Sequence, residues 1–368
     1  MLLCFLSFAF SIPESDWMGI FSGTTQPSGV YQRVNNFENR RLLDIIMPGS
    51  HDAAVNLDVN SFAARAQGMN ILNQLNSGVR FLDLRVRPSA RASQPIKLQT
   101  FHAPLEFLAK LHMFKGQTFS EILDQVNQFL DNHPTEIVIF KVKPLAEYVT
   151  NIAQRIMAQI DNNPSLKNKL IKKPSISEEN LKSKTYQNLV VANKRLLIIF
   201  ESETVTNNYV YSKNLLYSNP PLATSRDDLV NRLKSNLPVR TNHLLQNKFV
   251  LFHWTITYTP FKLFGIRSIT ESLEQNLNFF DTIRSEIFPM NKLFQIIMMD
   301  FVNPNKCKRV IILNQERYLN YFRVINPPPT HALAPPSAVP VPNSYKKLYR
   351  RHHHGHSSQH SHRRHHRN

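Results

Sequence analysis

Residues 118–142 read TFSEILDQVNQFLDNHPTEIVIFKV, and their pattern changes from that of a helix to that of a strand. In the first part, apolar residues recur at spacings of three and four, the period of a helix with one buried face. They are Phe119, Ile122, Leu123, Val126, Phe129 and Leu130. Thr118 and Glu121 have the spacing of a capping box, and His133 precedes a proline that ends the helix. The apolar run at 136–142 then predicts a buried strand, so this stretch is typical of a parallel α/β sheet.

The same alternation of short apolar runs and amphipathic stretches extends from about residue 40 to residue 325. The runs that we interpret as strands are residues 42–47, 79–86, 136–142, 195–200, 249–256, 294–301 and 310–313. About seven strands separated by helices predict one α/β barrel domain, closed or incomplete. We place this domain at residues 17–325.

The chain is strongly basic, with 44 basic and 26 acidic residues among 368 and a formal charge of +18. Such a charge favours a polyanionic partner, either a nucleic acid or an anionic membrane surface. The basic residues are not interleaved with aromatic ones in the way that stacked bases require, so we expect no nucleic-acid partner. A hydrophobic content of 42% excludes disorder throughout the chain. The two cysteines, Cys4 and Cys307, allow no disulfide framework.

Both ends of the chain differ in composition from the middle. Residues 1–11, MLLCFLSFAFS, form an apolar run that resembles a short secretory signal and is too short to span a bilayer. We therefore expect secretion, the alternative being a cytoplasmic protein at the membrane periphery. Residues 326–345 are proline-rich and predict a linker. Residues 346–368 contain eight histidines and seven basic residues, which predict a disordered tail; metal or phosphate binding is the alternative.

Titratable residues gather where the predicted strands end, which is where barrel enzymes place their catalytic groups. His51 and Asp52 follow the apolar run 42–47 after a Pro-Gly-Ser turn, and Asp300 lies within the run 294–301. An unpaired buried carboxylate is costly, so Asp300 should meet a cationic or hydrogen-bonding partner, and a histidine suits this role best. Consecutive Ser, His and Asp residues cannot form a serine-protease triad, because they cannot face one another in that geometry.

Two further segments add charge to the same strand ends. In 79–86, VRFLDLRV, the alternation of a strand puts Asp83 and Arg85 on one side. A half-exposed antiparallel strand would show the same pattern. Lys143 directly follows the run 136–142 and lies on the same face as Lys141. His102 follows a short run of its own, where a structural hydrogen bond is the alternative to a catalytic role.

Two histidines, three aspartates, an arginine and a lysine at strand ends suit the chemistry of a phosphodiester. One histidine can deprotonate a nucleophile while the other protonates the leaving oxygen, and the arginine can offset charge that develops on phosphate. No carboxylate cluster at these positions has the spacing of a calcium or magnesium site, and the scanned cofactor motifs are missing. The sequence therefore predicts a site without metal or cofactor.

The order and spacing of these segments resemble those of the phosphatidylinositol-specific phospholipase C X domain. The segments are Ser-His-Asp at 50–52, Phe-Leu-Asp-Leu-Arg at 81–85, His102, Glu-Ile-Val-Ile-Phe-Lys-Val-Lys at 136–143 and Ile-Met-Met-Asp-Phe at 297–301. The resemblance covers roughly residues 17–324 and is strongest to metal-independent bacterial enzymes and to eukaryotic proteins with an X domain alone. It implies a distorted TIM-type barrel and catalysis through an inositol cyclic phosphate.

The resemblance also implies a role for each residue at the strand ends. His51 would be the general base toward the inositol 2-hydroxyl, with Asp300 as its orienting partner. His102 would be the general acid, supported by Asp52.

In the same resemblance, Arg85 and Lys143 would bind substrate. Arg85 would contact the phosphate where calcium-dependent relatives have a carboxylate ligand, and Asp83 would anchor Arg85 or its surroundings. Lys143 falls where those relatives carry a glutamate. Both replacements are from acid to base and imply independence of calcium.

The expected function is therefore hydrolysis of phosphatidylinositol or a related lipid in an anionic membrane. One alternative is a catalytically inactive lipid-binding X domain, which the complete set of acid, base and phosphate-binding residues disfavours. Another is a metal-dependent phosphodiesterase barrel of the glycerophosphodiester type. That type needs a Glu-x-Asp pair of metal ligands, and this chain has Asp83-Leu84-Arg85 at the corresponding strand end.

Overall fold

The computed structural model describes most of the chain between residues 13 and 325. The described residues are 13–26, 31–56, 65–89, 97–102, 115–145, 149–202, 209–220, 222–223, 225–236, 242, 246–255 and 295–325. Residues Met1–Phe322 form one compact unit, and Arg323–Asn368 form a second. The expected signal peptide at 1–11, linker at 326–345 and tail at 346–368 lie outside the described residues.

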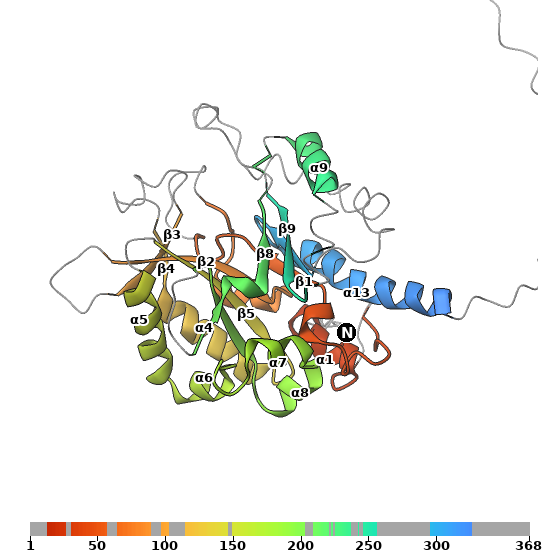
Figure 1. Cartoon of the computed structure of the whole chain (residues 1–368), viewed down its shortest axis with the longest axis horizontal. Coiled ribbons are helices and arrows are strands. Elements are labelled where there is room, and N and C mark those ends of the chain that lie inside the picture. Colours follow the sequence, from red (N-terminus) through yellow and green to blue (C-terminus); the bar gives the residue numbers. More distant parts are fainter. Residues whose placement is uncertain are drawn as a thin grey trace, which may run out of the picture. The chain divides into compact units, whose positions relative to one another are not determined.

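The larger unit is built on a curled, mainly parallel sheet (Figure 1). Its strands are β1 (Met47–Ser50), β2 (Phe81–Pro88), β5 (Val138–Pro144), β6 (Leu196–Phe200), β7 (Tyr211–Ser212), β8 (Leu216–Ser218), β9 (Phe249–Trp254) and β10 (Ile296–Met299). They pair in the order β7-β6-β5-β2-β1-β10-β9-β8, and every pair along this path is parallel. Within the described residues β7 and β8 do not pair with each other, so the barrel is open between them.

A short antiparallel extension continues the carboxyl end of β2. β3 (Leu98–Phe101) pairs with β2, and β4 (Lys115–Thr118) pairs with β3. Thr118 is both the last residue of β4 and the N-cap of the following helix. The extension matters for function because it positions His102, the residue that directly follows β3.

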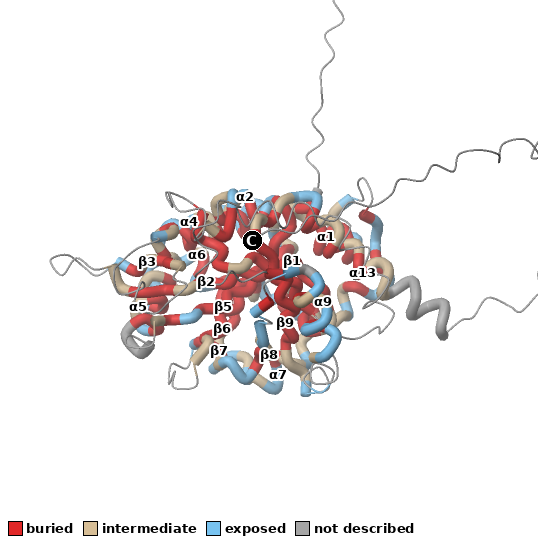
Figure 2. Tube along the Cα trace, turned by 90° about the horizontal axis from the view of Figure 1, so that it is seen from above, coloured by how far each residue is buried: buried red, intermediate tan, exposed pale blue. Residues whose placement is uncertain are grey.

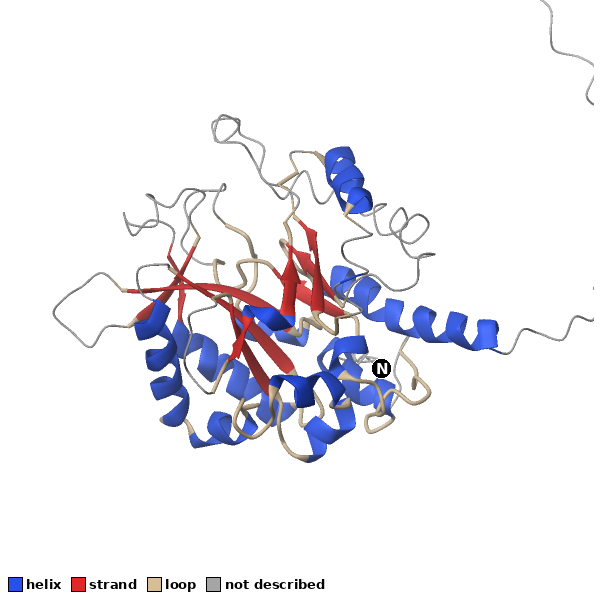
Figure 3. Cartoon of the chain, in the orientation of Figure 1, coloured by secondary structure: helices blue, strands red, loops and turns tan. Residues whose placement is uncertain are grey.

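Most of the helices lie along the outer side of the sheet, whereas α9 (Arg226–Ser235) stands apart above the upper ends of β8 and β9 (Figure 3). The helices are α1 (Trp17–Ser22), α2 (Ile71–Asn76), α4 (Phe119–Asn132), α5 (Val149–Asp161), α6 (Pro164–Lys169), α7 (Glu178–Ser183), α8 (Tyr186–Val191), α9 and α13 (Pro304–Ile325). Short 3-10 turns occur at Pro13–Asp16, Leu42–Asp44 and Lys213–Leu215. In α4, the capping box of Thr118 and Glu121 is present and the six predicted apolar residues are buried, so both predictions for this helix are confirmed.

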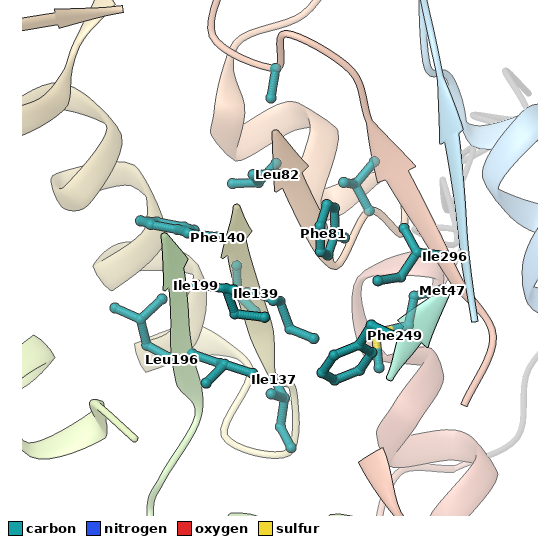
Figure 4. Packing of buried hydrophobic residues seen from close by; sticks show 14 of the residues in the cluster. Met47, Phe81, Leu82, Ile137, Ile139, Phe140, Leu196, Ile199, Phe249 and Ile296 are labelled. Atoms are coloured by element: carbon teal, nitrogen blue, oxygen red, sulfur yellow. The ribbon is translucent and has the colours of Figure 1, made fainter. Parts of the chain in front are cut away.

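The strands form the centre of the core, and the exposed positions belong mainly to surrounding helices and turns (Figure 2). Side chains that alternate along each strand pack on two sides. Phe140 packs against Phe119 of α4, with ring centroids 6.2 Å apart, on the helix side. Met47, Phe81 and Ile296 belong to the other set, and Figure 4 shows members of both sets, which come from several strands. The core is thus double, with one layer under the helices and one inside the barrel.

Two of the predicted strands are wrong. The run 42–47 contains a 3-10 turn, Leu42–Asp44, and β1 begins only at Met47. The run 310–313 lies inside α13, which Pro304 begins. Several buried positions of α13 follow the helical spacing of three and four; they are Cys307, Val310, Ile311 and Asn314. A four-residue apolar run alone does not distinguish strand from helix, and here the flanking residues decide.

The other predicted strands are present as β2, β5, β6, β9 and β10, with bounds shifted by a few residues. The short strands β3, β4, β7 and β8 were not expected. The predicted α/β barrel is confirmed, in its incomplete form. In the part of the chain that the structure describes, no helix combines the length and apolar character needed to cross a membrane.

Candidate active site

The register of the parallel strands brings the predicted site residues to one end of the barrel. Residues paired in register on neighbouring strands point to the same side of the sheet. Gly49 is paired with both Phe81 and Met298, and Asp83 with Lys141. Every second side chain along a strand points to the same side. His51, Asp83 and Asp300 come two positions after Gly49, Phe81 and Met298. Together with Lys141, the partner of Asp83, they therefore form one inward-facing layer at the carboxyl ends of the strands. Arg85, Lys143 and Glu201 form the next layer outward.

Gly49 allows the core to close directly beneath this layer. A Cβ atom on Gly49 would lie 2.7 Å from Sδ of Met298 and 2.8 Å from Cγ2 of Ile296, closer than real Cβ contacts. Both neighbours are buried in the barrel interior. The glycine therefore leaves room for the side chains of Ile296 and Met298 in the layer below His51.

His51 and Asp300 form a close pair across β1 and β10. Nδ1 of His51 lies 2.8 Å from Oδ1 of Asp300, and the side chains are 19% and 5% exposed. A carboxylate oxygen can only accept, so Nδ1 carries the proton and Nε2 holds the lone pair in the neutral ring. This Nε2 lies 3.5 Å from Oδ2 of Asp52. The arrangement presents an oriented imidazole whose free nitrogen faces the interior of the site.

Asp52 links the two histidines. Its side chain is fully buried, and the same Oδ2 atom lies 3.5 Å from Nε2 of His51 and 3.6 Å from Nε2 of His102. The two imidazole nitrogens are therefore at most about 7 Å apart. Nε of Arg85 lies 2.8 Å from Oδ1 of Asp52 as an ion pair without the alignment of a hydrogen bond. One carboxylate thus lies within 4 Å of two histidines and an arginine, residue types that suit phosphate chemistry.

The charges of this cluster shift several pKa values. Burial lowers the pKa of His51, but the carboxylates of Asp52 and Asp300 outweigh burial and raise it to about 9. Burial likewise raises the pKa of Asp83, but Lys141 and His51 outweigh it and lower the value to about 2. The pKa of Asp52 is also lowered, because Arg85, His51 and His102 together overcome its burial. At neutral pH the resting site therefore holds charged Asp52 and Asp83 and a mostly protonated His51.

These ion pairs predict how stability depends on pH. His51 has a pKa near 6.5 in an unfolded chain and about 9 in the fold, so its contribution to stability is complete below pH 6.5. The contribution falls as pH rises and is gone above about pH 9; its upper limit is about 3 kcal/mol. Urea unfolding of the wild type and of His51→Gln from pH 6 to 9.5 measures this. We expect the wild type to lose more stability across that range than the variant, and parallel curves would contradict the assigned ion pairs.

Lys141 is a site residue that the sequence interpretation underrated. It is 5% exposed, and its Nζ lies 3.2 Å from Oδ1 of Asp83 and 2.9 Å from Oε2 of Glu201. Lys143, which was expected to bind substrate, is 54% exposed in the outer layer, 4.0 Å from Oε1 of Glu201. Strand alternation in the sequence puts both lysines on one face, but only the register of β2 and β5 puts Asp83 directly opposite Lys141. Asp83 was expected to anchor Arg85 or its surroundings, and the cation at ion-pair distance from it is Lys141.

His51, Asp52 and Asp83 each offer an atom that could bind a metal, and these atoms lie within 4.8 Å of one another. The carboxylates already have cationic partners, Arg85 on Asp52 and Lys141 on Asp83. A divalent ion would have to displace or tolerate both cations at close range, which like-charge repulsion opposes. The donor set therefore fits a metal poorly.

An incomplete parallel α/β barrel whose rim gathers two histidines and an arginine around a buried aspartate defines a class of protein suited to phosphodiester chemistry. Comparison with known proteins agrees with this class. Residues 37–219 match the family model described as PI-PLC X, so this segment of the chain is similar to the phosphatidylinositol-specific phospholipase C X domain. His51, His102, Arg85 and Lys141 lie inside the matched segment, whereas Asp300 lies beyond it.

Two curated relatives are named 1-phosphatidylinositol phosphodiesterase. The one from Listeria monocytogenes is 24% identical over 155 residues, which are 39% of this chain and 43% of the relative. The one from Staphylococcus aureus strain Newman is 30% identical over 109 residues, which are 29% of this chain and 31% of the relative. The chain thus matches less than half the length of each of these relatives.

Solved structures extend the likeness over the whole barrel. A phosphatidylinositol-specific phospholipase C from S. aureus has a TM-score of 0.57 at 17% identity, covering 82% of this chain and 98% of its own. The enzyme from L. monocytogenes has a TM-score of 0.53 at 18% identity, covering 82% of this chain and 99% of its own. At these identities the likeness shows the shared fold.

Proposed function

We propose that this chain is a phosphatidylinositol-specific phospholipase C that cleaves the lipid phosphodiester without calcium. The observation that carries the proposal is the approach of His51, His102 and Arg85 to the two oxygens of the buried Asp52. In this proposal the three residues act as base, acid and phosphate-binding cation, and their approach to one carboxylate supports these roles. The match of residues 37–219 to the family model and the names of the curated relatives support the choice of phosphatidylinositol as substrate.

In the proposed reaction, Nε2 of neutral His51 takes the proton from the inositol 2-hydroxyl, whose oxygen attacks phosphorus. The bond from phosphorus to the lipid oxygen breaks, and protonated His102 gives its proton to that oxygen. The product retains the phosphate as a cyclic diester of inositol. Asp300 keeps the Nδ1 proton of His51 in place, which leaves Nε2 directed at the substrate.

The raised pKa of His51 has a mechanistic consequence. With a pKa of about 9, roughly one molecule in a hundred has neutral His51 at pH 7 before substrate binds. A base with a high pKa is a strong base, so the small active fraction is offset by a larger driving force for proton transfer. Arg85 and Lys141 supply fixed positive charge opposite the phosphoryl oxygens, where negative charge increases in the transition state.

The proposed activity is tested with purified full-length protein and vesicles that contain labelled phosphatidylinositol. Phosphorus NMR of the water-soluble fraction identifies the product. Appearance of inositol cyclic phosphate before the open monophosphate is the expected result. Stable vesicle binding without any water-soluble phosphate would instead identify an inactive lipid-binding domain.

We expect cleavage to be independent of calcium. Excess chelator should leave the rate unchanged, because Arg85 occupies the place next to Asp52 that a cation would take. Arg85→Ala should lower kcat by about 10²-fold or more, since it removes a preorganised charge on the phosphate. Added calcium should not restore this loss. A rate that collapses in chelator and returns with calcium would refute the metal-free mechanism.

The proposed site of action is an anionic membrane surface, to which the +18 charge of the chain is complementary. Secretion, expected from the apolar run at 1–11, remains part of this proposal. Comparison of culture medium with cell lysate after expression with the native N-terminus tests it, and retention of all protein in the cells would argue for the cytoplasmic alternative.

A further inference from the structure

Gln67 is a fully buried residue that bonds to the backbone on both sides of the His51–Asp300 pair. It is 0% exposed. Its Nε2 donates to the carbonyl oxygens of His51, at 2.8 Å, and Met299, at 3.0 Å. Its Oε1 accepts from the backbone N–H of Val302 at 3.0 Å. One side-chain amide thereby connects the loop after β1 to the loop after β10, with neither loop adjacent to it in sequence.

Each of these loops contains a residue with an unfavourable backbone conformation. Asp52, next to His51, has φ +41°, and Phe301, next to Asp300, has φ +46°. Residues other than glycine adopt this left-handed region at a cost and keep it only when their surroundings enforce it. At Asp52 the conformation is useful, because consecutive side chains of an extended strand would point to opposite faces. The turn lets both His51 and Asp52 face the site.

The bonds of Gln67 fall on the peptide groups that flank these two residues. The carbonyl of His51 belongs to the peptide that precedes Asp52, and the N–H of Val302 belongs to the peptide that follows Phe301. The backbone around Gln67 reinforces the connection. Phe301 N donates to Ala66 O at 2.8 Å, and the N–H groups of Ala66 and Gln67 both approach Val55 O at 3.3 Å. Residues 66–67 thus fasten the two catalytic loops to each other.

We propose that Gln67 is a positioning residue that holds the imidazole of His51 against the carboxylate of Asp300. The effect on turnover rests on the proposed function, whereas the effect on the geometry and ionisation of His51 does not. The groups that face His51 are Asp300 from the loop after β10, Asp52 from its own loop and Asp83 from β2. Gln67 controls the placement of Asp300 relative to Asp52. Its hydrogen bonds end on the backbone of Met299, next to Asp300, and of His51, next to Asp52.

The test replaces the amide with an apolar side chain of similar length in Gln67→Met and measures the titration of His51 by NMR of its ring nitrogens. The matched control is Gln295→Met. Gln295 is also buried, at 4% exposure, and its Oε1 accepts from Val250 N at 2.7 Å, but it lies at the opposite end of β10. Both variants lose buried hydrogen bonds and should lose thermal stability, so stability alone does not distinguish them.

In Gln67→Met we expect the pKa of His51 to move from about 9 toward 6.5 by about one unit or more. We expect kcat on phosphatidylinositol vesicles to fall about tenfold or more with little change in KM, because the base is misplaced rather than the lipid site. Gln295→Met should titrate like the wild type. Gln67→Asn keeps the amide but is one methylene shorter, so it should give an intermediate shift.

Unchanged His51 titration in both Gln67 variants would overturn the proposal. If neither variant folds, hydrogen exchange of the wild type decides: the Val302 amide should be strongly protected, and rapid exchange in the folded protein would overturn the bond to Gln67. A wild type that does not cleave phosphatidylinositol, combined with a shifted His51 titration in Gln67→Met, would refute the proposed function and leave the positioning role of Gln67 intact.

Discussion

Replacement of His51 by alanine is expected to lower kcat/KM for phosphatidylinositol by about 10²–10⁴-fold while the fold is retained. The reason is that the imidazole paired with Asp300 is the proposed base, whereas His102, the second histidine beside Asp52, is the proposed acid. His102→Ala should give a loss of similar size through the leaving oxygen. The double variant should lose far less than the product of the two, since both groups act in the same displacement step.

His133 provides a matched control for the His51 variant. Its Nδ1 lies 2.8 Å from Oδ1 of Asp16, and its side chain is 18% exposed, against 2.8 Å and 19% for His51 with Asp300. His133 is the C-cap of α4 and precedes β5, so it lies at the amino end of the strands, away from the site. His133→Ala should retain activity. If His51→Ala, folded by circular dichroism, keeps wild-type turnover, His51 is not the base.

The second large effect concerns stability. Arg80→Ala should reduce the free energy of unfolding by about 3–5 kcal/mol, because it leaves a buried carboxylate without its cation. Arg80 and Glu136 are both 0% exposed, and Nε of Arg80 donates to Oε2 of Glu136 at 2.7 Å. Glu136 has a pKa already raised by burial, an effect that Arg80 opposes. Without Arg80, Glu136 would have to remain charged in the core or bind a proton.

The remaining bonds of Arg80 add to the expected loss. Its Nη1 donates to the carbonyls of Leu75 and Val79, and its Nη2 donates to those of Glu14 and Ser15. Arg80 therefore fastens the N-terminal segment to the base of β2.

Arg195→Ala is the matched control for Arg80→Ala. Arg195 is also buried, and it donates to the carbonyls of Leu130 and His133. Within the described residues it has no carboxylate at ion-pair distance. Urea titration should show a clearly smaller loss for Arg195→Ala, and equal losses would indicate that the Arg80–Glu136 pair adds nothing specific.

Local patterns in the sequence were sufficient where one element carries its own signal. The helix α4 combines a cap, a helical period of apolar residues and a proline after its end, so its type and limits follow from neighbours in the chain. The central strands could be recognised because strands buried on both faces are apolar along their whole length. The run 310–313 failed because four apolar residues satisfy either period, and the packing of α13 decided between them.

The sequence by itself placed titratable residues at strand ends, and the resemblance it carries named His51, His102, Asp52, Asp83, Arg85, Lys143 and Asp300 as partners in one site. Only the tertiary structure decided their contacts, because these depend on strand register and on residues far apart in the chain. Register put Lys141, rather than Lys143, against Asp83. The role of Gln67 had no local signal at all, since its bond to Val302 spans 235 positions and exists only when β1 and β10 lie side by side.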